Sequence, residues 1–371
     1  MTRTVVLAGT SGYGATYLRE IAGLEKEGVL RLAGLCDVRP LVSSAQPQFG
    51  DRLFDSRLDR LLDLTRPDVA IVSTPIHTHL PLGRAALEAG CHLMLEKPPA
   101  PSAAEWRELD ALSRQAGVSC QVGFQSLGSG AFARLAELMA AGTLGRIQGI
   151  GCYGAWTRDA AYYQRAAWAG RRELDGRPVA DGALTNPFAH ATATALALDG
   201  STGWDDIATL ETELFRVRDI ATDDTSCLRL TTRRGTVITV AVTLAARVPA
   251  EPVLIVHGSR LRAELRYTED VLVVDGRPTR YGRTSPLRNL LDHLGDPPVA
   301  LQSSIAACGA FTRVLETVNT SPSPRLLDDR WLARDGEGLK TRTYVRGVEE
   351  AVRASAERLA TFTELGEPWA A

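Results

Sequence analysis

The sequence contains little lysine and none of the long apolar runs that mark a membrane protein. Only three of the 42 basic residues are lysines, at positions 26, 97 and 340, so arginine supplies nearly all of the positive charge. The formal net charge of −2 creates no global field that would attract nucleic acid or an anionic membrane. The first residues enter a strand pattern directly, without the regions of a signal peptide. We therefore expect a cytoplasmic protein that binds neither nucleic acid nor membranes.

Cysteine and histidine are too sparse to build a metal site. The six cysteines stand singly, without a Cys-x-x-Cys pair, and are interpreted as reduced thiols that are mostly buried. Among the six histidines, His77 and His79 are two residues apart, but no further ligands follow at a useful spacing. The sequence therefore predicts no metal.

The first third of the chain alternates between short apolar runs and amphipathic segments. The total length of 371 residues leaves room for two domains. Ser102 and Glu105 have the spacing of a capping box, which predicts a helix start. The pattern predicts strands at 4–8, 30–36, 69–73, 91–98 and 118–124, with helices at 15–24, at 80–89 and from 102. Strands that alternate with helices in this way are typical of a parallel sheet built from βαβ units.

A glycine-rich turn follows the first predicted strand. Its three fingerprint positions read Gly9, Ser11 and Gly14, so serine replaces the middle glycine of the dinucleotide-binding pattern, and Gly12 stands beside it. The strand before the turn and the helix after it provide the context that this fingerprint requires. The turn is therefore interpreted as a pyrophosphate-binding turn, with a nucleotide-free α/β turn as the alternative.

An acidic residue ends the second predicted strand, 23 residues after Gly14. Asp37 is placed to accept hydrogen bonds from a ribose diol, and its negative charge favours NAD over a cofactor with a 2′-phosphate. Arg39 lies two residues further on and could accommodate NADP. The cofactor is therefore predicted to be NAD, with NADP left open.

The segment "TPIHTHLPLGRAALEAGCHLMLEKP" resembles the signature of the Gfo/Idh/MocA oxidoreductases, which act on sugars and inositols. The segments 122–147 and 223–246 continue the resemblance, which covers nearly the whole chain and is most specific at 69–98. It implies an α/β fold with an N-terminal doubly wound Rossmann domain at 1–124. It also implies a C-terminal α+β domain with a large, mostly antiparallel sheet at 125–371, and a last helix, at about 344–365, that packs back on the first domain. By resemblance we further expect a homo-oligomer, a dimer or tetramer, that pairs through the C-terminal sheet.

The residues of the second domain support such a sheet independently. Apolar or alternating runs follow one another with turn signals between them and no helices in between, which argues for antiparallel pairing. The predicted strands are 148–157, 208–218, 224–231, 236–246, 252–257, 261–267 and 271–275.

The resemblance assigns the central chemical role to Lys97, which in the family hydrogen-bonds the reacting hydroxyl and helps to position the nicotinamide. Hydride transfer from a secondary alcohol leaves a developing carbonyl, so the oxygen needs a donor and its proton needs a base. A lysine ammonium is a compact donor whose pKa can shift, whereas arginine stays charged. Glu96 is expected to anchor backbone, and Pro98 restricts Lys97 to extended geometry, with a cis peptide bond left open.

The segment "DGALTNPFAHATATALAL" resembles the part of the family in which an Asp and a His four residues later face the substrate. Here the pair is Asn186 and His190, so the carboxylate is replaced by an amide, and Asp181 is the nearest other acid in sequence. Asn186-Pro187 also predicts a helix start with Asn186 as N-cap. The positive end of that helix would keep His190 neutral and able to accept a proton.

Aromatic residues and arginines are concentrated at residues 153–172. Aromatic faces stack on sugar rings, and guanidinium groups bind carboxylates or phosphates. A packed aromatic core with a solvated arginine face, or a subunit interface, would give the same composition. The predicted substrate-binding residues are Trp156, Arg158, Tyr163, Arg165 and Trp168.

These observations predict an NAD(P)-dependent oxidoreductase that acts on a secondary hydroxyl or ketone of a sugar, cyclitol or sugar derivative. Two alternatives stay open: a redox-neutral glycoside-cleaving or epimerising enzyme that retains NAD, and a non-catalytic nucleotide-binding regulatory protein. For His79, a structural helix cap stays open beside a role near the cofactor. The predicted catalytic residues are Lys97, His190 and Asn186. The predicted cofactor contacts are Gly9, Ser11, Gly12, Tyr13, Gly14, Asp37, Arg39, Thr74, Pro75, His79, Glu96 and Lys97.

Overall fold

The computed structural model describes residues 2–39 and 52–371, which fold into two compact units. The described residues up to 124, together with 285–306, form the first unit, and residues 125–284 and 307–371 form the second. The segment that returns to the first unit is therefore 285–306. The sequence assigned this return to the last helix, but that helix belongs to the second unit.

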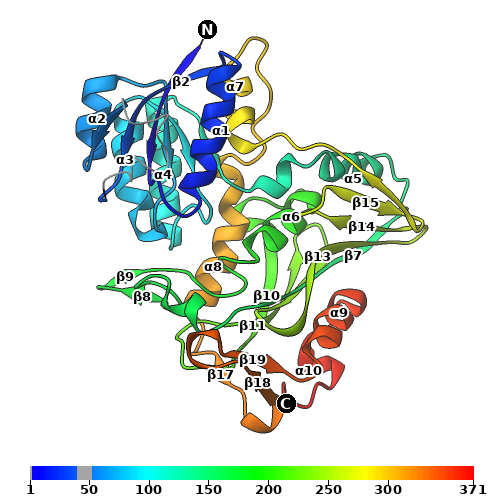
Figure 1. The fold of residues 1–371 in the computed structure, drawn as a ribbon. Helices are drawn as coiled ribbons and strands as arrows, with labels where there is room; N and C mark the ends of the chain where they lie inside the picture. The colour runs from blue at the N-terminus through cyan, green and yellow to red at the C-terminus, as the bar shows by residue number, and fades with distance from the viewer. Residues whose placement is uncertain (1, 40–51) are drawn as a thin grey trace. The chain divides into compact units, whose positions relative to one another are not determined.

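The first unit contains a parallel six-stranded sheet in the order β3-β2-β1-β4-β5-β6. Helices α1 and α7 pack near one another, and α2, α3 and α4 form a second group (Figure 1). The strands are β1 (Arg3–Ala8), β2 (Leu30–Cys36), β3 (Leu53–Asp55), β4 (Val69–Val72), β5 (His92–Leu95) and β6 (Cys120–Val122). The helices are α1 (Gly14–Lys26), α2 (Leu58–Thr65), α3 (His79–Glu88), α4 (Ala103–Ala116) and α7 (Pro286–His293). The predicted doubly wound Rossmann sheet is confirmed, whereas β3 and α2 were not predicted.

Local sequence explains these elements. Every residue of β4 is fully buried, as expected for a continuous apolar run in a parallel sheet that is covered on both faces. The Ser102 hydroxyl accepts a hydrogen bond from the Glu105 amide at 3.3 Å and caps α4, as its spacing predicted. Gly117 ends the same helix in the left-handed conformation.

The second unit contains a nine-stranded sheet in the order β16-β15-β14-β13-β7-β12-β11-β10-β17. Adjacent strands are antiparallel except in the pairs β7–β12 and β10–β17, so the predicted mostly antiparallel sheet is confirmed. Its strands are β7 (Ile147–Thr157), β10 (Ile207–Arg216), β11 (Thr225–Thr232), β12 (Val237–Thr243), β13 (Ala245–Gly258), β14 (Arg262–Arg266), β15 (Val271–Val274), β16 (Arg277–Arg280) and β17 (Arg325–Leu326). Two small ribbons are β8 (Glu173–Leu174) with β9 (Arg177–Pro178) and β18 (Leu332–Asp335) with β19 (Arg342–Val345).

Helices cover both faces of the sheet centre. The helices of this unit are α5 (Gly130–Ala140), α6 (Ala189–Asp199), α8 (Gly309–Thr320), α9 (Val348–Arg358) and α10 (Phe362–Leu365). Successive residues of a strand point to opposite faces. On β7, a Cβ added at Gly151 would overlap the backbone of Ala356 in α9, whereas one at Gly154 would meet Phe188, the N-cap of α6.

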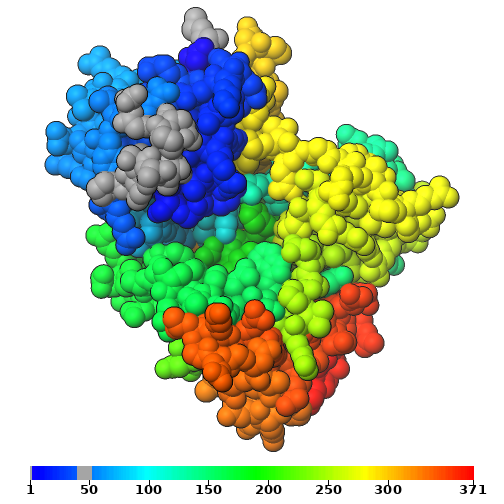
Figure 2. All heavy atoms as spheres, viewed as in Figure 1, coloured from blue at the N-terminus to red at the C-terminus, as the bar shows by residue number. Residues whose placement is uncertain are grey.

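The C-terminal segment packs on its own unit. Helix α9 contacts β7, β12 and β13, and Phe362 and Trp369 pack with Phe215 of β10. The segment is drawn in orange and red beside the green part of the same unit (Figure 2). The part of the sheet face that α9 covers is not available to a second copy of the chain. Oligomerisation through the remaining strands stays a prediction.

The described residues contain no helix long and apolar enough to cross a membrane. Within the same residues, no group of three or more His, Cys, Asp or Glu side chains could hold a metal ion. All six cysteines are free and buried.

Candidate active site

The turn between β1 and α1 brings backbone groups close together. Gly9 has a φ of +87°, and a Cβ there would overlap the Ser73 carbonyl oxygen, while one at Gly14 would overlap the Gly9 oxygen. Gly12 has a φ of +57° and no heavy atom within 4 Å of its would-be Cβ, so its backbone can be approached closely. The first amides of α1 donate back to the turn, from Gly14 to the Ser11 oxygen at 3.0 Å and from Thr16 to the Tyr13 oxygen at 2.8 Å, so the turn and the helix start form one hydrogen-bonded unit. These features fit the pyrophosphate of a dinucleotide.

The carboxylate of Asp37 lies at the carboxyl end of β2, beside this turn. Its Oδ2 accepts hydrogen bonds from the Thr10 amide and the Thr10 hydroxyl, each at 2.8 Å. Its Oδ1 accepts one from the Arg39 amide at 3.1 Å. The side chain is therefore held in place next to the glycine turn, and its contact with a ribose stays a prediction.

His79 joins the turn after β4 to the loop after β5. One ring nitrogen lies 2.9 Å from the Thr74 carbonyl oxygen, and the other lies 2.9 Å from that of Pro98. The side chain is 1% exposed, and burial lowers the pKa of His79 to about 4, so the ring is neutral at physiological pH. A neutral ring donates to one of the two carbonyl oxygens, and its tautomer decides which one. The ring thus holds the loop that carries Lys97, while a direct contact of His79 with the cofactor stays a prediction.

Glu96 connects that loop to α1. The Tyr17 hydroxyl of α1 donates to Oε1 at 2.7 Å, and the Lys97 amide donates to Oε2 at 3.2 Å. Burial raises the pKa of Glu96 to about 7, although the Tyr17 hydrogen bond works in the opposite direction. The Lys97–Pro98 peptide bond is cis. Sequence reasoning expected Glu96 to anchor backbone but missed Tyr17, which is 79 positions away.

The predicted cofactor residues that are not discussed individually occupy the same sheet edge. Ser11 and Tyr13 lie in the turn after β1, and Thr74 and Pro75 directly follow β4. Because the strands are parallel and adjacent, these turns all lie at the carboxyl end of the sheet, where open α/β sheets bind ligands.

In the second unit, a buried loop carries Asn186. The Asp223 side chain, 1% exposed, accepts hydrogen bonds from the Leu184 amide at 3.3 Å and the Ser226 hydroxyl at 2.6 Å. Burial raises the pKa of Asp223. The backbone amide of Asn186 also donates to the Gly182 carbonyl oxygen at 3.0 Å. The loop is therefore fixed by hydrogen bonds from its own backbone to a side chain on the β10–β11 connection.

Asp181 lies next to Asn186 and accepts four hydrogen bonds from three donor nitrogens. Its carboxylate accepts from the Asn186 Nδ2 at 2.7 Å, from Arg165 Nη2 at 2.7 and 2.9 Å, and from the Gly170 amide at 2.8 Å. The predicted N-cap role of Asn186 is wrong, because α6 starts at Ala189 with Phe188 as N-cap. The helix begins later because the backbone amides of Asn186 and Phe188 donate within the loop, to the Gly182 and Ala183 oxygens at 3.0 and 2.9 Å, and the Asn186 side chain is oriented by its hydrogen bond to Asp181.

His190 is the second residue of α6, so its predicted place in the first turn is confirmed. Its Nδ1 lies 3.3 Å from the Ser126 hydroxyl oxygen, which accepts a hydrogen bond from the Thr194 hydroxyl at 2.8 Å. With the proton on Nδ1, the ring donates to Ser126 and Nε2 carries a lone pair. Sequence reasoning missed Ser126 and Thr194, since neither carries a motif.

Four of the five predicted substrate residues form one stack of rings and guanidinium groups. The Trp156 ring stacks on Phe188 with centroids 4.2 Å apart. The Arg158 guanidinium lies over Trp156 and over Tyr162, at 5.2 and 5.0 Å. The Arg165 guanidinium lies 3.7 Å from the Tyr162 ring and 4.6 Å from the Trp168 ring. Arg165 is therefore occupied by Asp181 and two aromatic faces.

The fifth predicted substrate residue, Tyr163, lines a separate cavity of about 980 Å³. Segments 160–173 and 216–221 form most of its wall, and the Arg218 guanidinium lies 4.6 Å from the Tyr163 ring. Within the described residues, the buried Tyr163 hydroxyl has no hydrogen-bond partner. Neither Asn186 nor His190 lines this cavity.

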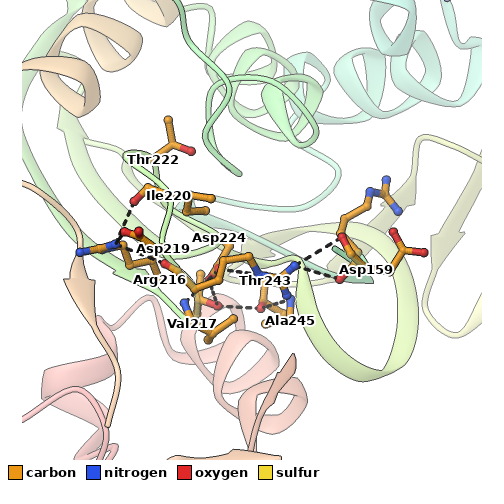
Figure 3. A network of polar contacts seen from close by, with 12 residues as sticks. Asp159, Arg216, Val217, Asp219, Ile220, Thr222, Asp224, Thr243 and Ala245 are labelled. Atoms are coloured by element: carbon orange, nitrogen blue, oxygen red, sulfur yellow. Dashed lines mark hydrogen bonds and ion pairs between the residues drawn. The ribbon is translucent and has the colours of Figure 1, made fainter. Parts of the chain in front are cut away.

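The charged side chains that line the cavity are four arginines, Arg171, Arg172, Arg216 and Arg218, and two acids, Glu173 and Asp219. Figure 3 shows Arg216 with Asp219 and the Ile220 carbonyl oxygen, at 3.2 and 3.1 Å. The same view shows Asp224, which accepts from the Val217 amide at 3.0 Å. Asp224 is fully buried 3.8 Å from Arg218, and its burial raises its pKa to about 6. The lining is therefore richer in basic than in acidic side chains, and within the described residues the buried Nε and Nη2 of Arg218 have no hydrogen-bond partner.

Comparison with known proteins finds a family model that matches the first unit and curated relatives that match part of the chain. The family model described as "Oxidoreductase family, NAD-binding Rossmann fold" matches residues 3–124. An uncharacterized oxidoreductase of Escherichia coli, YdgJ, is 39% identical over 80 residues, which are 22% of this chain and 23% of YdgJ. The D-glucoside 3-dehydrogenase of Escherichia coli is 33% identical over 121 residues, which are 32% of this chain and 34% of that enzyme. The chain thus matches about a quarter to a third of the length of these relatives.

Similarity to solved structures extends over both units. The WlbA dehydrogenase from Bordetella pertussis, solved with NADH and UDP-GlcNAcA, matches with a TM-score of 0.71 and 20% identity, over 86% of this chain and 95% of that one. The UDP-N-acetylglucosamine 3-dehydrogenase GnnA from Acidithiobacillus ferrooxidans matches with a TM-score of 0.69 and 16% identity, over 86% and 97%. At these identities the similarity concerns the fold.

Proposed function

We propose that this chain, whose residues 3–124 belong to the Gfo/Idh/MocA family of NAD-binding Rossmann oxidoreductases, oxidises a secondary hydroxyl of a sugar, cyclitol or sugar derivative or reduces the matching ketone. The observation that carries the proposal is the set of contacts around Lys97. His79 and Glu96 hold its loop at the same sheet edge as the glycine turn. A lysine held there is placed to act beside a dinucleotide.

The first unit supplies the cofactor half of the proposed site. Gly9, Gly12 and Gly14 would hold the pyrophosphate, and Asp37 would accept from the ribose. The negative charge of Asp37 supports NAD, and the exposed Arg39 keeps NADP as the alternative. The nicotinamide, when bound, supplies the hydride acceptor or donor.

In the proposed reaction, three side chains of this chain share the work on the hydroxyl. Lys97 donates a hydrogen bond to the reacting oxygen and stabilises the charge that develops on it. His190, in the tautomer that donates to Ser126, takes the hydroxyl proton on Nε2. Asn186 cannot take a proton, so its role is to orient the substrate through hydrogen bonds.

The relatives support a sugar-like substrate, since they include a D-glucoside 3-dehydrogenase and a UDP-N-acetylglucosamine 3-dehydrogenase. The exposed parts of the Trp156–Arg158–Trp168 stack offer aromatic faces and guanidinium edges for such a ligand. Arg165 is proposed to support these residues without contacting the ligand, because its guanidinium is held by Asp181.

A redox-neutral reaction is the second candidate, and the amide at position 186 favours it. An enzyme that retains NAD and cleaves or epimerises its substrate returns the hydride, so it needs a different set of proton donors and acceptors from a dehydrogenase. Asn186 removes one acid–base group from that set.

The test measures NAD binding first and turnover second. The purified protein should bind NAD in a calorimetric titration, and should generate reduced nicotinamide absorbance with at least one member of a panel of sugars, glycosides and sugar nucleotides. Release of an aglycone without net reduction would select the redox-neutral reaction. Binding of NAD or NADP without turnover of any of these substrates would select the non-catalytic nucleotide-binding protein, and absence of NAD and NADP binding would overturn the proposal.

A further inference from the structure

The contacts of Asp181 point to a role that no motif assigns to it. We propose that Asp181 is a positioning residue that fixes the orientation of the Asn186 side-chain amide, with Arg165 as its counter-charge. The proposal rests on the proposed function only in that Asn186 is taken to contact the substrate. Its geometry stands by itself.

Only one orientation of the Asn186 side-chain amide forms a hydrogen bond with the Asp181 carboxylate. An ionised carboxylate only accepts hydrogen bonds, so the atom of Asn186 that lies 2.7 Å from Asp181 Oδ1 is the Nδ2 donor. The amide Oδ1 is then turned away from Asp181. An amide that donates to a carboxylate is also polarised, which makes its oxygen a stronger acceptor.

The surroundings of Asp181 place hydrogen-bond donors on both of its carboxylate oxygens. The carboxylate accepts four hydrogen bonds, two from Arg165 Nη2, one from the Gly170 backbone amide and one from the Asn186 side-chain amide. Four hydrogen bonds are the full acceptor capacity of a carboxylate. The side chain is 1% exposed, and the nearby Tyr162 ring lies under Arg165. Asp181 therefore cannot itself bind a substrate and acts through Asn186.

This arrangement places the negative charge one side chain further back than in an Asp-x-x-x-His pair. Position 186 presents a neutral acceptor of fixed orientation, and the carboxylate behind it holds that orientation. Proton transfer is then left to His190 and Lys97, because Asn186 has no ionisable group.

Three variants test the pairing. In Asp181→Asn one carboxylate oxygen is replaced by an NH₂ donor, so Asn186, Gly170 and Arg165 compete for a single acceptor oxygen and the hold on the 186 amide weakens. We expect kcat/KM for the sugar to fall about tenfold while the NAD affinity is unchanged. Asn186→Asp brings two carboxylates within hydrogen-bond distance, so one of them is protonated near neutral pH, and a new ionisation appears in the pH profile. The double variant Asp181→Asn with Asn186→Asp restores one carboxylate and one amide in reverse order. It should recover thermal stability and bring an ionisable group to position 186.

The matched control is Asp219→Asn, which makes the same chemical change at an exposed aspartate that pairs with Arg216. It should leave kcat/KM and the pH profile unchanged. Wild-type kcat/KM in Asp181→Asn would overturn the proposal. So would an Asp181→Asn variant whose loss of activity is fully explained by a lower folded fraction at the assay temperature.

A readout without turnover separates this inference from the proposed function. In the NMR spectrum of the wild-type protein, the side-chain NH₂ protons of Asn186 should be shifted and protected from exchange, and Asp181→Asn should reduce the protection. If no sugar is oxidised but the protection follows Asp181, the proposed function fails and the positioning role stands. If the wild-type amide exchanges freely, the positioning role fails whatever the activity.

Discussion

Two buried carboxylates stand beside the proposed catalytic residues, one in each unit, and they are compensated in different ways. Glu96 accepts one tyrosine hydroxyl and the backbone amide of Lys97, and its pKa rises to about 7 through burial. Asp181 accepts four hydrogen bonds, two of them from a guanidinium. The free-energy cost of burying Glu96 is thus reduced largely by its protonation, whereas the cost of burying Asp181 is reduced by the Arg165 cation.

The two modes of compensation give the loops of Lys97 and Asn186 different supports. Near neutral pH, Glu96 is close to half-protonated beside Lys97, so the charge of that loop varies with pH. Asp181 is held instead by the Arg165 guanidinium and by the amides of Gly170 and Asn186. The first unit therefore contains a support whose charge varies with pH, and the second contains a support built on an ion pair.

The largest expected effect comes from removing the lysine beside Glu96. Lys97→Ala should lower the rate of sugar-dependent NAD reduction by about 1,000-fold, because a donor to the developing charge is lost. Lys97→Arg should recover little, since a flat guanidinium does not replace a compact ammonium. Lys340→Ala, which removes an exposed lysine of the second unit, is the control. Wild-type turnover in Lys97→Ala would remove Lys97 from the chemistry.

Breaking the ion pair in the second unit should affect stability most. Arg165→Met keeps an unbranched stem but leaves Asp181 buried without its cation, and we expect a loss on the order of 3 kcal/mol in the free energy of unfolding. Chemical denaturation measures it, with Arg171→Met at an exposed position as control. A loss no larger than that of the control would show that the Gly170 and Asn186 donors suffice.

His79 should make the first unit sensitive to acid. The folded state holds the ring neutral with a pKa of about 4, whereas the unfolded chain takes up a proton near pH 6.5, so stability is lost as pH falls through this window. The loss by pH 5, relative to pH 8, is roughly 2 kcal/mol.

The raised pKa of Glu96 acts with the opposite sign and costs stability as pH rises from about 4.5 to 7. The difference between the wild type and His79→Gln isolates the histidine, because both proteins contain Glu96. Parallel pH curves for these two proteins would mean that the ring protonates equally well in the folded state.

The smallest effect concerns the hydroxyl that holds Glu96. Tyr17→Phe should raise the pKa of Glu96 further, because the lost hydrogen bond favoured the ionised form, and should cost about 1 kcal/mol of stability. A carbon-13 NMR titration of the Glu96 carboxyl measures the shift. Tyr344→Phe removes a hydroxyl that binds Asp335 in the second unit and should leave this titration unchanged. A downward shift in Tyr17→Phe would contradict the assigned role.

Features that depend on neighbours in sequence could be predicted. The buried runs of β1 and β4, the Ser102 cap and the glycine turn each follow from a few consecutive residues. The short strand β3 was missed because Leu53 and Phe54 are exposed and the strand has only three residues. The Asn186 cap failed because the backbone amides of Asn186 and Phe188 donate within the loop, so the helix begins later than the local preference predicts.

The sequence by itself determined the parallel Rossmann sheet, the mostly antiparallel second sheet, and the positions of Lys97 and His190 at the end of one strand and the start of one helix. These follow from hydrophobic periodicity, turn residues and caps, which act over a few residues. Only the tertiary structure decided that Tyr17 binds Glu96, that Asp181 holds Asn186, and that α9 covers β7. Each of these contacts depends on how loops and helices pack, and a buried polar group takes whichever partner that packing brings within 3 Å.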